Sequence, residues 1–302
     1  MSFIEAIVLG IIQGLAEFLP ISSSGHLALF KKMFGLSDVG LTFDLMLHFG
    51  TLVAVFIVYW MDIWELIKEG VMIIVDVCHN IVCFFKKNKR GYRKVVGTPY
   101  RRFVMLIIVS TIPTGIIGLL FKKIFNLDNP SLLVVGLSLL ITACLLYIVD
   151  VLPEKRKREE TVSFKDAVIV GVAQGIATLP GISRSGTTIT VERMLGFDRK
   201  FAVKYSFIMS IPAILGANIL DVKDLFDPAN AISGSQFMCY LAGTVVAGAV
   251  VVPLLLPVVV QPAMARARVR ARIIAKTFFI FLDSFFYGVF VITLVNYTAK
   301  TK

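Results

Sequence analysis

Long apolar runs are the feature that most restricts how this chain can fold. Close to twenty residues with few charges among them occur in six stretches, at about 41–60, 103–121, 131–150, 201–219, 236–258 and 277–297. A helix of about 20 apolar residues crosses the hydrocarbon core of a bilayer. Only 17% of the 302 residues are charged, below the roughly 25% of a soluble domain. We therefore predict an all-α integral membrane protein, with residues 1–302 forming one polytopic domain.

Clusters of basic residues predict the orientation of these spans. Lys and Arg concentrate in cytoplasmic loops, so we expect 86–102, 154–158 and 262–276 to face the cytoplasm. The acidic segment DVKDLFD (221–227) should face outward. The formal charge of +11 is thus a matter of topology and not of nucleic-acid binding. The stretch 61–85 is too charged for a good span, and we expect an amphipathic helix at the membrane interface there.

Two short polar stretches outside the spans resemble each other. SFIEAIVLGIIQGLAEFLPISSSG (2–25) aligns without a gap with SFKDAVIVGVAQGIATLPGISRSG (163–186), at a constant offset of 161. The identities include Gln, Ser and Gly in register, which a chance likeness between apolar helices does not produce. We take them as parts of an internal repeat that relates 1–150 to 163–297.

The repeat predicts an inverted topology. Each copy holds one hairpin too short to span, followed by three transmembrane helices, and three crossings bring the second copy in from the opposite side. Inverted repeats of this kind place broken helices near the membrane midplane. A bent, polar backbone at membrane depth is tolerated only when it is buried in protein or lines a wet cavity. We therefore expect two re-entrant helical hairpins that touch each other.

The first hairpin carries a carboxylate beside a run of hydroxyls. Gln13 and Glu17 are four residues apart and share one helix face, and Pro20 ends that helix. Residues 22–24 are serines that can cap the next helix, whose free N–H groups form an anion site. Each serine taken alone is explained equally well as a cap or hinge. The whole set, with unpaired charges inside a membrane, indicates a functional site.

Aligned positions of the two hairpins differ in a way that favours an enzyme. The first hairpin supplies Glu17 as a base, Ser23 as a hydroxyl nucleophile and His26 as a proton carrier. The second supplies Arg184, the planar cation suited to phosphate. An enzyme acting on a phosphate ester or anhydride needs both an activated nucleophile and charge neutralisation. The hydroxyls expected to bind phosphate belong to Ser22, Ser24, Ser183, Ser185, Thr187 and Thr188.

Both bends carry motifs of a known family. GLAEFLPISSSGH (14–26) and PGISRSGTT (180–188) resemble the two signatures of the bacterial undecaprenyl-diphosphate phosphatases of the bacitracin-resistance type. The resemblance implies hydrolysis of undecaprenyl diphosphate to undecaprenyl phosphate and inorganic phosphate, which recycles the lipid carrier for peptidoglycan synthesis. It implies a multi-pass protein of the bacterial inner membrane whose active site opens towards the periplasm.

The same resemblance implies a divalent cation, Mg²⁺ or Ca²⁺, at Glu17 and Gln13. Gln13 stands where the family also uses glutamate, so Glu17 is the one carboxylate of this pair. The expected partners are a polyprenyl diphosphate and membrane lipids, without nucleic acid, and a homodimer is left open.

Other interpretations stay open at this point. A polyprenyl-phosphate transporter or flippase fits the inverted repeat, and a non-catalytic lipid-binding subunit fits the anion site. His48, four residues after Asp44, either lines the cavity or is a satisfied core histidine. His79 lies in the amphipathic stretch, where we expect it to be solvated.

Overall fold

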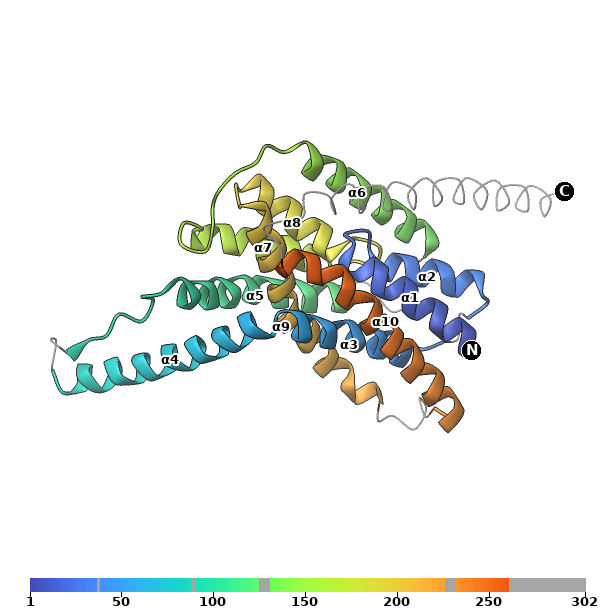
Figure 1. Ribbon diagram of the computed structural model, residues 1–302, viewed down its shortest axis with the longest axis horizontal. Coiled ribbons are helices and arrows are strands. Elements are labelled where there is room, and N and C mark those ends of the chain that lie inside the picture. The colour runs from blue at the N-terminus through green and yellow to red at the C-terminus, as the bar shows by residue number, and fades with distance from the viewer. Residues whose placement is uncertain (37–38, 88–90, 125–130, 226–231, 261–302) are drawn as a thin grey trace. The chain divides into compact units, whose positions relative to one another are not determined.

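Helices make up all the regular secondary structure in the part of the chain that the structure describes. This computed structural model describes residues 1–36, 39–87, 91–124, 131–225 and 232–260 (Figure 1). Residues Met1–Leu256 form one unit and Pro257–Lys302 a second. The helices are α1 (Phe3–Phe18), α2 (Ser23–Met33), α3 (Leu41–Val58), α4 (Trp60–Phe85), α5 (Pro99–Ile124), α6 (Leu132–Val151), α7 (Phe164–Ile176), α8 (Arg184–Met194), α9 (Arg199–Leu225) and α10 (Gly234–Val260).

Four described helices are long and apolar enough to cross a membrane, namely α5, α6, α9 and α10. They coincide with four of the predicted spans. The predicted span 41–60 falls on α3, which bends by 83° into α4 and forms one further span candidate together with it. The prediction of an all-α membrane protein is therefore confirmed. The predicted span 277–297 lies outside the described residues, as does the basic segment 262–276.

The two copies of the sequence repeat each form a helix–bend–helix hairpin, α1–α2 and α7–α8. Helix α8 begins and ends 161 residues after α2 begins and ends. Helices α1 and α7 start with the same capping box. The side chain of Ser2 or Ser163 accepts from the backbone N–H of Glu5 or Asp166, and the serine's own backbone N–H donates to that residue's carboxylate. Such reciprocal caps satisfy backbone donors that a helix start leaves free. Equal local sequence therefore gives equal local structure in both copies.

Paired glycines pack each hairpin against a helix of the other copy. A side chain at Gly10 or Gly14 would collide with α10, at the carbonyl oxygens of Gly243 and Ala247. A side chain at Gly171 or Gly175, the repeat partners of Gly10 and Gly14, would collide with Ser110 or Ile117 of α5. Close approach of helices through small residues is typical of membrane proteins. The two halves are therefore interleaved.

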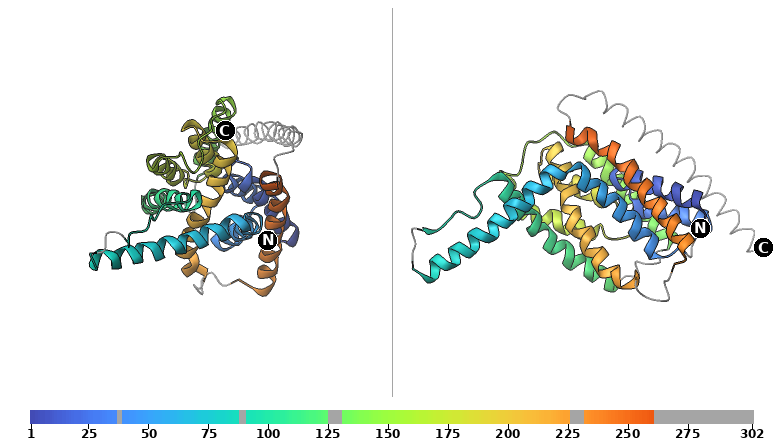
Figure 2. Two further views of the ribbon diagram at one scale, coloured as in Figure 1. Left: turned by 60° about the vertical axis from the view of Figure 1, so that its left-hand side comes forward. Right: turned by 60° about the horizontal axis from the view of Figure 1, so that its bottom comes forward.

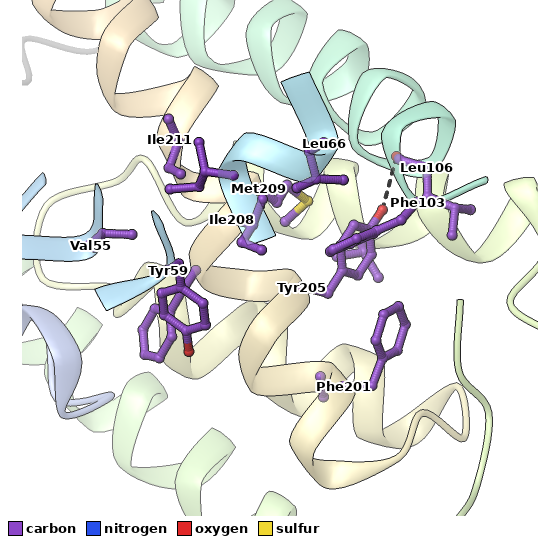
Figure 3. Packing of buried hydrophobic residues seen from close by; sticks show 14 of the residues in the cluster. Val55, Tyr59, Leu66, Phe103, Leu106, Phe201, Tyr205, Ile208, Met209 and Ile211 are labelled. Carbon is purple, nitrogen blue, oxygen red and sulfur yellow. Dashed lines mark hydrogen bonds between the residues drawn. The ribbon is translucent and has the colours of Figure 1, made fainter. Parts of the chain in front are cut away.

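An aromatic cluster fixes α9 against α5 beside the hairpins (Figure 3). The rings of Phe201 and Tyr205 stack with centroids 5.8 Å apart, and Phe103 lies 5.6 Å from Tyr205. The Tyr205 hydroxyl donates to the carbonyl of Leu106 at 2.9 Å, so its one polar group is satisfied in the core. This packing holds in place the α9 face that carries Ser206 and Ser210 next to α8.

Candidate active site

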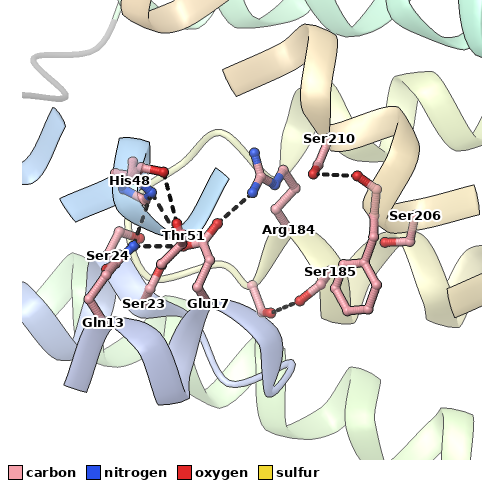
Figure 4. Close-up of polar contacts among 12 residues, drawn as sticks. Gln13, Glu17, Ser23, Ser24, His48, Thr51, Arg184, Ser185, Ser206 and Ser210 are labelled. Atoms are coloured by element: carbon pink, nitrogen blue, oxygen red, sulfur yellow. Dashed lines mark hydrogen bonds and ion pairs between the residues drawn. The ribbon is translucent and has the colours of Figure 1, made fainter. Parts of the chain in front are cut away.

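Both polar bends meet directly. The Arg184 guanidinium donates from Nη2 to Glu17 Oε1 at 2.6 Å, although 167 residues separate them (Figure 4). The backbone N–H of Gly181 donates to Ser24 Oγ at 3.3 Å. A side chain at Gly25 would meet Gly181. The predicted contact between the two hairpins is confirmed.

Glu17 is the centre of a converging set of donors. Its side chain is 6% exposed. Ser23 Oγ donates to Glu17 Oε2 at 2.5 Å, and Gln13 Nε2 donates to the same oxygen at 3.0 Å. With Arg184 on Oε1, both carboxylate oxygens are engaged, as burial of a charged group requires. A hydroxyl that donates to a carboxylate is the arrangement of a nucleophile and its base.

His48 of α3 completes this cluster. Its Nδ1 lies 3.3 Å from Glu17 Oε2 and 3.1 Å from Gln13 Nε2. A neutral ring accepts there from the Gln13 amide, whereas a protonated ring donates to Glu17. His48 also lines the cavity described below. Of the two alternatives that the sequence left open, the structure therefore has His48 in the site.

His26 is directed elsewhere. Its side chain is buried at 4% exposure, and Nδ1 donates to the carbonyl of Ser22 at 2.7 Å. The residues that line the main cavity do not include it. The ring turns back along α2 towards the bend, so His26 is not among the residues that contact Glu17 in the described contacts. The sequence signal for His48 was its position one helical turn after Asp44 within an otherwise apolar helix.

The serines of the two bends act as caps and still border the cavity. Ser22 and Ser183 accept from the backbone N–H groups of Gly25 and Gly186, at 3.3 and 3.1 Å. Ser22 adopts a φ of 72°, a left-handed conformation that is costly for a residue other than glycine and is often found at functional sites. Ser22 and Ser183 therefore act as caps and also line the cavity.

Two of the predicted phosphate-binding hydroxyls do not reach the cavity. Thr187 Oγ1 donates to the carbonyl of Ser183 at 2.8 Å, and Thr188 Oγ1 pairs with Ser206 Oγ at 2.6 Å. Both side chains are buried and neither lines the cavity. They sit three and four residues into α8, where the helix has already turned them against itself and α9. The other four, Ser22, Ser24, Ser183 and Ser185, line the cavity as predicted.

A cavity of about 350 Å³ opens over Glu17, Ser23 and Arg184. Asp44, Gln174, Thr178 and Asn218 add polar groups to its lining, and Leu45, Ala213, Ile214 and Ala217 add apolar ones. The first turn of α8, with Arg184 and Ser185, also lines it, and a helix N-terminus favours an anion. Such a lining suits an amphiphile with an anionic head group.

Comparison with known proteins identifies close relatives. The family model described as "Bacitracin resistance protein BacA" matches residues 6–265. The undecaprenyl-diphosphatase of Methanosphaera stadtmanae is 45% identical over 225 residues, which cover 74% of this chain and 79% of the relative. That of Alkaliphilus metalliredigens is 45% identical over 228 residues, or 75% and 79%. That of Halothermothrix orenii is 41% identical over 247 residues, or 82% and 84%.

Proposed function

Because the chain belongs to the bacitracin resistance protein BacA family, we propose that it hydrolyses undecaprenyl diphosphate to undecaprenyl phosphate and inorganic phosphate. This reaction returns the lipid carrier to peptidoglycan synthesis and accounts for resistance to bacitracin. The observation that carries the proposal is the cluster of Ser23, Glu17 and Arg184, joined by contacts of 2.5 and 2.6 Å. A transporter needs an anion site but has no use for a hydroxyl bonded to a carboxylate base.

The first step in the proposed mechanism is attack by Ser23. Its Oγ bonds to the terminal phosphorus while the bond from that phosphorus to the bridging oxygen breaks. The Ser23 proton passes to Glu17 Oε2, its present hydrogen-bond acceptor, and undecaprenyl phosphate leaves. Water then attacks the phosphoserine, releases inorganic phosphate and restores the hydroxyl.

Arg184 neutralises the charge that the phosphoryl oxygens carry. One N–H group already binds Glu17, and the Arg184 guanidinium makes no other hydrogen bond to the described residues. Its remaining donors are therefore available to two phosphate oxygens in the planar geometry of a guanidinium. Electrostatic stabilisation of this type supplies most of the catalysis in phosphoryl transfer.

His48 is the proton carrier in this proposal, in place of His26. It lies against the carboxylate that receives the Ser23 proton. A ring in contact with Glu17 can pass that proton to the departing lipid phosphate and can later take one from the attacking water. His26, bonded to the Ser22 carbonyl, instead holds the shape of the bend.

A divalent cation, Mg²⁺ or Ca²⁺, remains part of the proposal. The groups that would hold it are Glu17 and Gln13 Oε1, a buried oxygen without a hydrogen-bond partner among the described residues. The described part of the chain contains no group of three or more His, Cys, Asp or Glu side chains that could hold a metal without further ligands. The donor set therefore fits a cation that substrate phosphates help to coordinate, which is usual for Mg²⁺. When bound, the cation would neutralise phosphoryl charge.

We further propose that the hairpins are re-entrant and that the repeat is inverted. The equal element offsets and the reciprocal glycine packing support this arrangement. In the proposed orientation in the bacterial inner membrane, the active site opens towards the periplasm, and 86–102 and 154–158 face the cytoplasm. Cysteine labelling of position 94 in intact cells tests it, since a reagent that cannot cross the membrane should not reach that position.

Release of phosphate by purified protein in detergent tests the activity. Wild type should release phosphate from undecaprenyl diphosphate, and Ser23→Ala should lose most of that activity. Transport alone predicts no release by wild type. Direct attack by water predicts that Ser23→Ala and Ser22→Ala both keep near-normal turnover.

A further inference from the structure

Helix α4 has one apolar face that the described residues leave largely exposed. Met61, Trp64, Val71, Val75 and Phe85 follow one side of it at helical spacing, and they are 45 to 78% exposed. The helix runs beside the start of α5 and then extends past the other helices of its unit (Figures 1 and 2). It is nearly perpendicular to α3, from which it bends by 83°. If α3 crosses the bilayer, α4 therefore lies along the surface.

The opposite face of α4 is acidic, and its carboxylates are paired with basic side chains, most of them outside the helix. Asp76 pairs with Arg93 at 3.2 Å and with Arg101 at 2.7 Å, and Arg101 also binds Glu69 at 2.6 Å. Asn80 exchanges two hydrogen bonds with the backbone of Arg93. The remaining two acidic residues of the helix are paired as well, Asp62 with Lys204 and Glu65 with Lys68. Through these contacts the segment around Arg93 runs back along α4. Each acidic side chain of the helix has a basic partner.

Three lysines that follow α4 have no ion-pair partner among the described residues. Lys86, Lys87 and Lys94 are exposed, and no ion pair within the described residues engages them. Lys86 and Lys87 directly follow Phe84 and Phe85, which are 68 and 78% exposed. Lys94 lies further back along the helix, where its carbonyl accepts from Arg101. The exposed phenylalanines can contact the acyl chains of an anionic phospholipid, and the neighbouring lysines can contact its head group.

We propose that α4 and the lysines of the segment that follows it form an interfacial arm that binds anionic phospholipid of the cytoplasmic leaflet. The paired acidic face, defined by Asp62, Glu69 and Asp76, points to the protein, and the apolar face enters the bilayer. Lys86, Lys87 and Lys94 select lipids with negative head groups. This proposal concerns binding away from the active site and does not depend on the reaction assigned above.

Tryptophan fluorescence offers a direct test, because Trp60 and Trp64 are the two tryptophans of the whole chain. Replacing both by Phe and introducing Phe85→Trp puts a single reporter at the basic end, at a position 78% exposed. The full-length protein is reconstituted into vesicles of phosphatidylglycerol and phosphatidylcholine, with one lipid brominated at a time. Brominated phosphatidylglycerol should quench the reporter more strongly than brominated phosphatidylcholine at equal mole fraction.

Lysine substitutions then test the cause of that preference. Changing Lys86, Lys87 and Lys94 to Gln should reduce it, by about fivefold for each lysine, which corresponds to about 1 kcal/mol per charge near an anionic surface. The matched control changes three exposed lysines on other helices to Gln, and the preference should persist. The control lysines are Lys32, Lys123 and Lys165. Retained phosphate release by every variant verifies folding.

Three outcomes would overturn the proposal. Equal quenching by the two brominated lipids means that the arm touches the bilayer without selecting charge. A preference that survives in the triple Lys→Gln variant means that other groups attract the lipid. No quenching by either lipid, with Trp60 and Trp64 of the wild type equally unquenched, means that a second copy or another protein covers the helix.

Discussion

Replacing Glu17 by Gln is the change that tests the proposed chemistry most directly. The amide keeps the size of the carboxylate but has only one acceptor oxygen. If that oxygen stays on Arg184, 2.6 Å away, the new NH₂ group faces Ser23 Oγ and Gln13 Nε2. Ser23 must then accept where it now donates at 2.5 Å, and the Gln13 amide loses its acceptor at 3.0 Å.

Reversal of the Ser23 hydrogen bond removes the base from the nucleophile. Loss of a positioned base costs about 10²–10⁴-fold in rate, so we expect kcat for phosphate release to fall by that factor while KM changes little. The unsatisfied Gln13 donor and the weaker Arg184 contact should cost about 1–3 kcal/mol of stability. Thermal unfolding in detergent measures this loss and shows whether the protein still folds.

A matched variant separates chemistry from structure. Thr51→Val removes a buried hydroxyl next to the cluster. Among the described residues this hydroxyl bonds only to the His48 carbonyl, at 2.8 Å. Because the hydroxyl takes no part in proton transfer, kcat should stay within about threefold of wild type. Glu17 is not the base if Glu17→Gln keeps kcat within about tenfold of wild type while folding normally. In that case Glu17 serves only to orient Arg184.

Three further changes test other parts of the site. His48→Gln should lower kcat by about 10²–10⁴-fold and flatten its pH profile, whereas His26→Gln should mainly lower the unfolding temperature; the reverse pattern in phosphate-release assays contradicts the proposed proton carrier. Arg184→Lys should not restore the activity that Arg184→Ala loses, because a point charge cannot reproduce the planar fork, and a lysine variant near wild-type turnover argues against two-oxygen binding. Glu192→Met should raise the unfolding free energy by about 1–3 kcal/mol, since both Glu192 oxygens are fully buried without a hydrogen-bond partner in the described part of the chain; a lower unfolding temperature would mean that the carboxyl has a role not visible in its contacts.

Much of the architecture could be predicted from the sequence, because the helices and bends depend on neighbouring residues and on the length of apolar runs. Apolar runs of about twenty residues predicted the spans that α5, α6, α9 and α10 realise. The duplicated motifs predicted two equivalent hairpins, and the serines at 22–24 predicted a helix start that the Ser22 cap confirms. Motif identity also predicted the family. Each of these features is specified within one helix or one bend, so no knowledge of helix packing was needed.

Only the tertiary structure decided which side chains share the cavity. The packing of α3 brings His48 onto Glu17, whereas His26 of α2 turns back to the Ser22 carbonyl, and the sequence offered both histidines beside polar neighbours. The same holds for Thr187 and Thr188, which share a motif with Arg184 but are turned into α8 and α9. Side-chain direction in such cases is set by how each helix is rotated against its neighbours. That rotation depends on contacts such as those of the glycine pairs with α5 and α10, between residues far apart in the chain.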